Sequence, residues 1–215
     1  MPKIAAYDSY CPIARALDTL GDRWTLLIMR ELANGDHRFT DLRRNLPGIA
    51  PNLLSQRLKD LIDEGLVTAK ELPPPAARTV YTATEYGRTT IPVLRALARF
   101  GFQRLEPADE GTPLRPVSAV NASLKPFYDP VRAGDLDELY DIVVDGESFR
   151  LASAYGGSDR PPTDTPDLRL ELPAWVLVDL RLGTVKFDDA LSRHLITKRG
   201  TAAALRNFRR IFQLD

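Results

Sequence analysis

The chain has 215 residues, 44% of them hydrophobic, and its 29 Lys and Arg balance 29 Asp and Glu. This length allows one large domain or two small ones. No apolar run approaches the roughly 20 residues of a membrane-spanning helix, and the first residues lack the apolar core of a signal peptide. The composition therefore excludes a membrane protein and predicts a cytoplasmic one. A single cysteine, Cys11, excludes an intrachain disulfide framework and a cysteine-cluster zinc site.

The two halves of the chain differ in charge. Residues 1–105 hold 15 Lys and Arg against 11 Asp and Glu, whereas residues 106–215 hold 14 against 18. Such an asymmetry is compatible with a basic half that meets an anionic partner. The excess is small, so it proves nothing by itself.

The N-terminal half is predicted to begin with four helices. Pro12 and Pro51 each suit the first turn of a helix, Gly21 ends the first helix, and Thr40 is the expected N-cap of the third. The helices are predicted in the sequences CPIARALDTL, DRWTLLIMRELANG, RFTDLRRNLPG and PNLLSQRLKDLIDEG.

A β-hairpin and a further helix are predicted next. LVTAKEL and RTVYTAT favour strands and flank the stiff tip PPPAA, residues 73–77. The sequence TEYGRTTIPVLRALARFGFQRL then predicts one helix. Its apolar stripe consists of Ile91, Leu94, Leu97, Ala98 and Gly101.

The helix that begins at Pro51 has an unusual solvent side. At 100° per residue one face is apolar, and it consists of Leu54, Leu58, Leu61 and Ile62. The residues that project outward are polar or basic, with no acid before Asp60, and they are Asn52, Ser55, Gln56 and Lys59.

Helices followed by a hairpin favour a winged helix-turn-helix whose fourth helix enters the major groove of double-stranded DNA. Asn52 and Gln56 suit adenine, Arg57 suits guanine, and Ser55 suits either. Lys59 suits phosphate, and Arg78 beside the hairpin tip suits the minor groove or its phosphates. Further contacts are predicted at the start of the third helix, from Arg38 and Thr40. The alternative is a solvated surface helix of a small helical domain.

Much of this half resembles the HxlR-type winged-helix transcriptional regulators, over roughly residues 10–101. The motifs that carry the resemblance are Cys11-Pro12, Gly21-Asp22-Arg23-Trp24, Arg38-Phe39, Leu42, Leu46-Pro47-Gly48-Ile49, Leu53-Leu54-Ser55, Arg57-Leu58, Leu61, Gly65-Leu66-Val67, Tyr81, Thr84 and Gly87. The resemblance implies a homodimer on a near-palindromic operator, with dimer contacts from residues 14–20 and 91–102. The tip ELPPPAARTV departs from the Tyr-Pro-Glu of many relatives, which leaves the contacts of the wing less defined.

Cys11 occupies the position at which some such regulators sense oxidants or electrophiles. It lies near a helix N-terminus, which favours a thiolate, but Arg15 is its one nearby cation and Asp8 opposes that charge. The alternative is an inert, buried thiol.

The C-terminal half is predicted to be mixed α/β after a Pro- and Gly-rich linker, residues 106–116. SAVNASLKPF predicts a helix, Asp145-Gly146 predicts the turn of a hairpin, and DLRLELPA predicts a strand. A second Pro-rich segment, residues 158–167, predicts a surface loop. The chain then ends in a short helix, a strand and an amphipathic helix, whose stripe is Leu205, Phe208, Ile211 and Phe212.

The order of these last elements resembles the second half of a sterol-carrier-protein-like domain. That resemblance implies an apolar tunnel for a lipid or another hydrophobic small molecule that acts as effector. The candidate lining residues are Phe149, Leu151, Trp175, Leu177, Leu180 and Phe187. Two alternatives are that these residues are plain core and that this half is an oligomerisation module without a ligand.

The fold class predicted is therefore α+β, with a winged helix-turn-helix domain at residues 1–105, a linker at 106–116 and a sterol-carrier-protein-like α/β domain at 117–215. The function predicted is a homodimeric DNA-binding regulator, by preference a repressor, modulated by a hydrophobic effector. The main alternative is a redox or electrophile sensor based on Cys11 with a structural C-terminal half; a lipid carrier or enzyme is a third hypothesis. No catalytic motif, cofactor or metal site is predicted.

Overall fold

The computed structural model describes residue 7 and residues 10–33, 35–73, 78–154 and 164–214. The chain divides into two compact units, Met1–Leu94 and Arg95–Asp215, so the division falls within a helix, eleven residues before the boundary expected at residue 105. Among the described residues, no helix has the length and apolar character needed to cross a bilayer.

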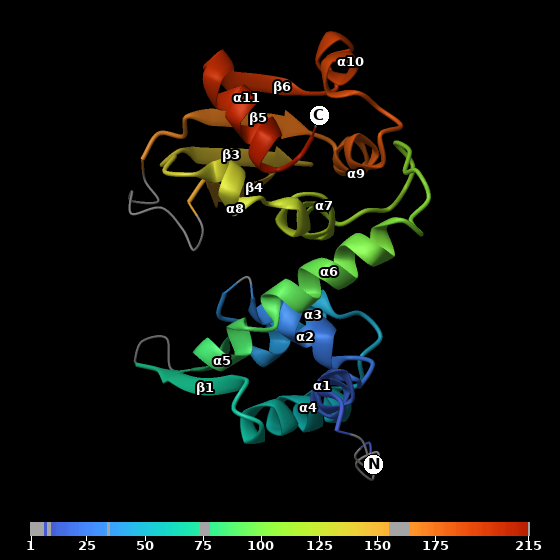
Figure 1. The fold of residues 1–215 in the computed structure, drawn as a ribbon, viewed down its shortest axis with the longest axis vertical. Helices are drawn as coiled ribbons and strands as arrows, with labels where there is room; N and C mark the ends of the chain where they lie inside the picture. The colour runs from blue at the N-terminus through green and yellow to red at the C-terminus, as the bar shows by residue number, and fades with distance from the viewer. Residues whose placement is uncertain (1–6, 8–9, 34, 74–77, 155–163, 215) are drawn as a thin grey trace. The chain divides into compact units, whose positions relative to one another are not determined.

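Unit 1 contains helices and one hairpin, and its last helix continues into unit 2 (Figure 1). In chain order the elements are α1 (Pro12–Leu20), α2 (Thr25–Leu32), α3 (Phe39–Asn45), α4 (Pro51–Asp63), β1 (Val67–Leu72), β2 (Arg78–Ala83), α5 (Glu85–Arg88) and α6 (Ile91–Phe102).

The first four helices lie where the sequence predicts them, but the start of α3 differs. Its N-cap is Arg38, whose extended backbone N–H donates to the carboxylate of Asp41 at 3.2 Å. Thr40 is the second residue of the helix and is exposed, so its predicted capping role is wrong. The carboxylate of Asp41 fixes the start instead, because it accepts the Arg38 N–H. Its negative charge also lies at the N-terminus of the helix, which carries a positive partial charge.

The core of unit 1 joins α2, α3, α4 and the base of the hairpin. Three of the four predicted apolar positions of α4 are buried, whereas Ile62 is 38% exposed. The buried cluster consists of Ile28, Met29, Leu32, Leu42, Leu46, Ile49, Leu54, Leu58, Leu61, Leu66, Val67 and Ala83. This shared core fixes α4 against the two preceding helices.

The predicted hairpin is confirmed as the antiparallel pair β1–β2, in register from Val67 opposite Ala83 to Leu72 opposite Arg78. His37, in the loop before α3, adds an isolated bridge to Tyr81, with N···O distances of 3.0 and 2.7 Å. This bridge ties the hairpin to the segment that leads into α3. The tip residues 74–77 lie outside the described residues.

The segment after the hairpin forms two helices rather than the single one predicted. Thr84 caps α5 by accepting the Gly87 N–H at 2.9 Å, and the Thr90 hydroxyl donates to the Gly87 carbonyl at 2.7 Å. That carbonyl also accepts the Thr90 N–H, at 3.1 Å. These short-range bonds close α5 after one turn, and α6 starts again with Pro92 in its first turn, where its missing N–H is harmless.

Unit 2 is built on a four-stranded sheet. Its elements are the end of α6, then α7 (Pro116–Ser123), η1 (Lys125–Phe127, a 3-10 helix), α8 (Pro130–Ala133), β3 (Leu139–Val144), β4 (Glu147–Ala152), β5 (Leu168–Leu172), α9 (Ala174–Leu182), α10 (Phe187–Ser192), β6 (Thr197–Gly200) and α11 (Ala202–Ile211).

The strand order in this sheet is β4-β3-β5-β6; β3 and β5 are parallel and the other pairs antiparallel. Asp145 and Gly146 join β3 to β4 with φ of 47° and 83°, as a type I′ turn requires, so the predicted hairpin is confirmed. The second Pro-rich segment, expected as a surface loop at 158–167, lies largely outside the described residues.

One face of the sheet carries the core of unit 2, and the other is polar. Leu168, Leu170 and Leu172 of β5 are buried, whereas Arg169 and Glu171 between them face away from the core. The predicted stripe of α11, which ends at Phe212, is buried on the core side. The segment predicted as a linker also contributes, because Ala108 is buried and its N–H donates to Asp179 at 3.0 Å.

Candidate nucleic-acid interface

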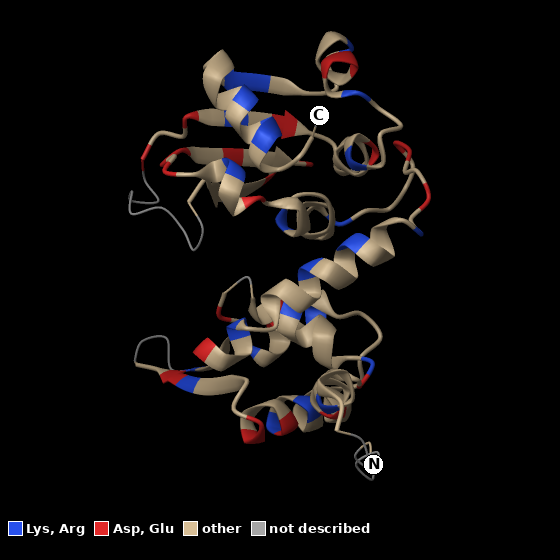
Figure 2. Ribbon diagram, in the orientation of Figure 1, with Lys and Arg blue, Asp and Glu red and all other residues tan. Residues whose placement is uncertain are grey.

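The outer face of α4 is the polar surface that the sequence predicts. Asn52, Ser55, Gln56 and Lys59 are all exposed. The Gln56 amide donates to Asp60 at 2.8 Å, one turn further along the helix. Figure 2 shows the acidic positions of α4 towards its C-terminal end, so its first two turns carry no acid of their own. A helix with this leading face suits insertion into the major groove.

Arg57 lies differently from the prediction. Its side chain is 16% exposed and its guanidinium forms ion pairs with Asp22 and, at 3.1 Å, with Asp60. The residue borders the apolar face of α4 and ties this helix to the loop before α2. Two carboxylates occupy its guanidinium, so Arg57 holds α4 in position, and its contact with guanine remains a prediction.

The other predicted DNA contacts occupy the start of α3 and the hairpin. The side chain of Arg38 is about half exposed and its guanidinium lies 3.9 Å from the Asp41 carboxylate. Thr40, in the first turn of α3, is exposed. Arg78 is exposed at the first position of β2. Arg43 of α3 is a further exposed arginine that was not predicted as a contact.

A buried carboxylate fixes the two helices that precede α4. Glu31 of α2 is 3% exposed. It accepts hydrogen bonds from Arg30 at 2.6 Å and, across to α3, from the Asn45 amide at 3.0 Å. A buried charge is tolerated when it is paired and hydrogen-bonded. Glu31 therefore sets the orientation of α3 relative to α2, on which the angle of α4 depends.

Two helices present apolar residues to solvent, and we refer to these residues together as the apolar stripes. Helix α1 buries none of its nine residues, and on one of its faces Ile13 is 72% exposed and Leu17 is 45% exposed. On α6 the exposed face consists of Val93, Leu97 and Phe100, at 43%, 46% and 64%. The exposed apolar face of α6 therefore differs from the predicted stripe, because Leu94, a member of that stripe, packs against the core of unit 1.

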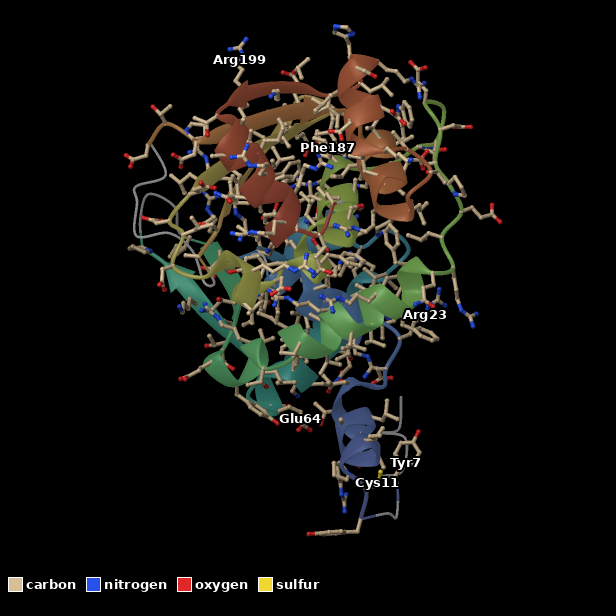
Figure 3. All side chains as sticks on the ribbon, turned by 45° about the horizontal axis from the view of Figure 1, so that its top comes forward. Tyr7, Cys11, Arg23, Glu64, Phe187 and Arg199 are labelled. Atoms are coloured by element: carbon tan, nitrogen blue, oxygen red, sulfur yellow. The ribbon has the colours of Figure 1, made fainter. Side chains whose placement is uncertain are left out.

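Cys11 is the N-cap residue of α1 and is partly exposed. The backbone N–H of Tyr7 donates to Asp18 of α1 at 3.1 Å, and Figure 3 labels both Tyr7 and Cys11. Arg15, the expected cationic neighbour, pairs with Asp18 at 3.6 Å. The thiol is therefore partly accessible, but the cation expected to activate it has a carboxylate partner.

The six predicted ligand residues belong to the core of unit 2 or pack against it. Leu177, Leu180 and Phe187 are buried (Figure 3 labels Phe187), and the others, Phe149, Leu151 and Trp175, are partly buried against the same cluster. None lines either of the two pockets described in unit 2. For Phe149 and Leu151 the alternating strand pattern explains this, because the apolar positions of β4 face the helices that cover the sheet.

A short helix, a second helix with an exposed polar leading face and a two-stranded hairpin define a winged helix-turn-helix protein. The model of the HxlR-like helix-turn-helix family matches residues 19–109. The chain belongs to this family: YvaP of Bacillus subtilis, an uncharacterised HTH-type transcriptional regulator, is 33% identical over 99 residues, which are 46% of this chain and 92% of YvaP.

Two further proteins are similar to part of the chain. The uncharacterised HTH-type transcriptional regulator Rv3095 of Mycobacterium tuberculosis is 40% identical over 103 residues, 48% of this chain and 64% of that protein. The solved structure of the reduced form of the transcriptional regulator YodB of Bacillus subtilis is 32% identical, with a TM-score of 0.41, and covers 47% of this chain and 100% of that one.

Proposed function

We propose that the protein is a homodimeric transcriptional regulator, acting as a repressor, that binds a near-palindromic operator in double-stranded DNA. The observation that carries the proposal is the exposed leading face of α4, which offers Asn52, Ser55 and Gln56; on binding, the Gln56 amide exchanges its hydrogen bond to Asp60 for one to a base. Amides and hydroxyls placed on a helix at this spacing reach the base edges of the major groove. Lys59 supplies a positive charge for phosphate.

The apolar stripes support a dimer. A helix of nine residues is marginal in isolation, so α1 needs tertiary packing to persist. Ile13 and Leu17 on α1 are four residues apart, as are Val93 and Leu97 on α6, so each pair lies on one face of its helix. We propose that a second copy of the chain covers both stripes, and that repression follows when the bound dimer occupies a promoter.

The recognition role of α4 is tested by exchanging Gln56 for Ala. We expect Gln56→Ala to lower the preference for operator over unrelated duplex by about 10–100-fold, since a lost base contact costs about 1–3 kcal/mol. Fluorescence anisotropy with labelled operator and scrambled duplex measures this preference.

Lys59→Ala is the matched control, because it alters the same exposed face without removing a group suited to bases. We expect it to weaken binding to both duplexes evenly and to reduce the salt dependence of binding by about one counterion. Full operator preference in Asn52→Ala, Ser55→Ala and Gln56→Ala proteins would refute the assignment of α4.

The C-terminal unit is proposed to be the effector module of this regulator. The order of its last elements, β5, α9, α10, β6 and α11, is the order that suggested a sterol-carrier-like domain from the sequence. The residues predicted to line the tunnel lie in or against the core of this unit, so they do not support the proposal.

A redox function is the competing proposal, and the partial exposure of Cys11 supports it. In that case an oxidant such as hydrogen peroxide lowers operator affinity in the wild type and leaves the Cys11→Ser protein unaffected. On the effector account the two proteins respond alike. Operator binding measured before and after oxidation, with reversal by a thiol reductant, separates the accounts.

A further inference from the structure

A cavity of about 520 Å³ in unit 2 has a lining unlike that of the predicted apolar tunnel. It lies among α6, η1, α9 and the segment after α11, and its volume is in the range of small-molecule sites. Its lining includes two arginines, two phenylalanines and two glutamines: Arg99, Arg181, Phe102, Phe127, Gln103 and Gln213.

The two arginines meet at one aromatic ring. The guanidinium carbon of Arg181 is 3.8 Å from the ring centroid of Phe127, and that of Arg99 is 5.6 Å from the same centroid. Among the described residues that line the cavity, none is acidic. Two positive charges therefore share a partly desolvated site that contains no carboxylate.

Hydrogen bonds fix the arginines without neutralising them. Arg181 donates to the carbonyls of Ser123 at 2.8 Å, Gln213 at 2.7 Å and Phe212, near the ends of α7 and α11. Arg99 donates from Nε to the Pro126 carbonyl at 2.8 Å. The terminal nitrogens of Arg99 have no protein partner among the described residues, so they are available to a ligand.

The electrostatics of the site favour an anion. Burial, and after it the charge of Arg99, lowers the pKa of Arg181 to about 10. Both causes penalise the positive charge, and an anion between the two guanidiniums relieves both. Arginine suits this role because its planar fork binds carboxylates through paired N–H groups.

We propose that this cavity binds a small carboxylate with an aromatic or other apolar body, and that this compound is the effector of the regulator. The role as effector rests on the proposed function. Arg99 and Arg181 bind the carboxylate, and the rings of Phe102 and Phe127 contact the apolar body. Arg99 precedes Phe100 of the apolar stripes on α6, so the ligand contacts the helix that we propose to form the dimer.

Benzoate is the probe for this site, and benzamide, its neutral isostere, is the matched control ligand. Titrations of the full chain followed by NMR should show a benzoate Kd on the order of 1 mM, with benzamide at least tenfold weaker. Arg99→Gln should weaken benzoate binding at least tenfold. Arg104→Gln, which removes an exposed arginine outside the cavity lining, should leave it unchanged.

Gln103→Glu gives a second test, because it supplies a carboxylate at the cavity. It should weaken benzoate binding at least tenfold and raise the unfolding temperature of the apo protein. Equal affinities for benzoate and benzamide, or a benzoate affinity unchanged in Arg99→Gln and Gln103→Glu proteins, overturn the proposal. The titrations need no DNA, so a failure here leaves the regulator assignment standing, and a failure of operator binding leaves the anion site standing.

Discussion

Leu97→Glu should convert the protein from a dimer to a monomer and lower operator affinity by about 100-fold or more. Leu97 is the centre of the exposed face of α6 and is 46% exposed in the single chain, so a carboxylate there is solvated in the monomer. In a dimer the same carboxylate is buried without a partner. The affinity falls because two linked half-sites bind with an avidity that one half-site lacks.

Analytical ultracentrifugation and operator titration measure the two effects of Leu97→Glu. Val131→Glu is the control, since Val131 of α8 is 89% exposed and lies outside the apolar stripes. It should remain dimeric with unchanged affinity. A Leu97→Glu protein that is folded, dimeric and fully active would remove α6 from the dimer interface.

Gly87→Ala should destabilise unit 1 by about 3 kcal/mol or more, a shift of roughly 12–24 °C in unfolding temperature for a domain of this size. A Cβ at Gly87 would lie 2.0 Å from the backbone carbonyl oxygen of Leu66, at the junction of α4 and the hairpin. Backbone atoms cannot move aside as the end of a side chain can. The hairpin would have to separate from α5, with loss of the Thr84 cap.

The matched control for Gly87→Ala is Gly101→Ala. A Cβ at Gly101 meets nothing within 4 Å, and this glycine lies inside α6. Alanine there should be neutral or stabilising by up to about 1 kcal/mol, since it lowers the entropy of the unfolded chain. Thermal unfolding followed by circular dichroism compares the two variants. Equal unfolding temperatures would show that the backbone at Gly87 is free to adjust.

The parts of this fold that local interactions determine were predictable from the sequence. Pro12 and Pro51 mark the starts of α1 and α4, and Asp145-Gly146 forms the turn between β3 and β4, because caps and tight turns depend on adjacent residues. The outward direction of Gln56 followed from helical periodicity alone. Its contact with DNA remains a prediction.

The parts that depend on distant partners were not predictable. Arg57 was expected on DNA, but Asp22, 35 positions earlier, pairs with it once the helices pack. Its second partner, Asp60, lies one turn along the same helix. Ala108 was assigned to a linker, because nothing local indicates its hydrogen bond to Asp179. The meeting of Arg99 and Arg181 at Phe127 likewise follows only from the tertiary fold.

The most direct test of the central claim is selection of preferred sequences from a random pool of duplex DNA by the full-length protein. A dimer with one α4 in each of two major grooves predicts two inverted half-sites whose centres lie roughly 34–36 Å apart, or a multiple of one helical turn. Enrichment of such a near-palindrome supports the account. A single asymmetric site would contradict the dimer, and a pool without enrichment would contradict sequence-specific recognition by α4.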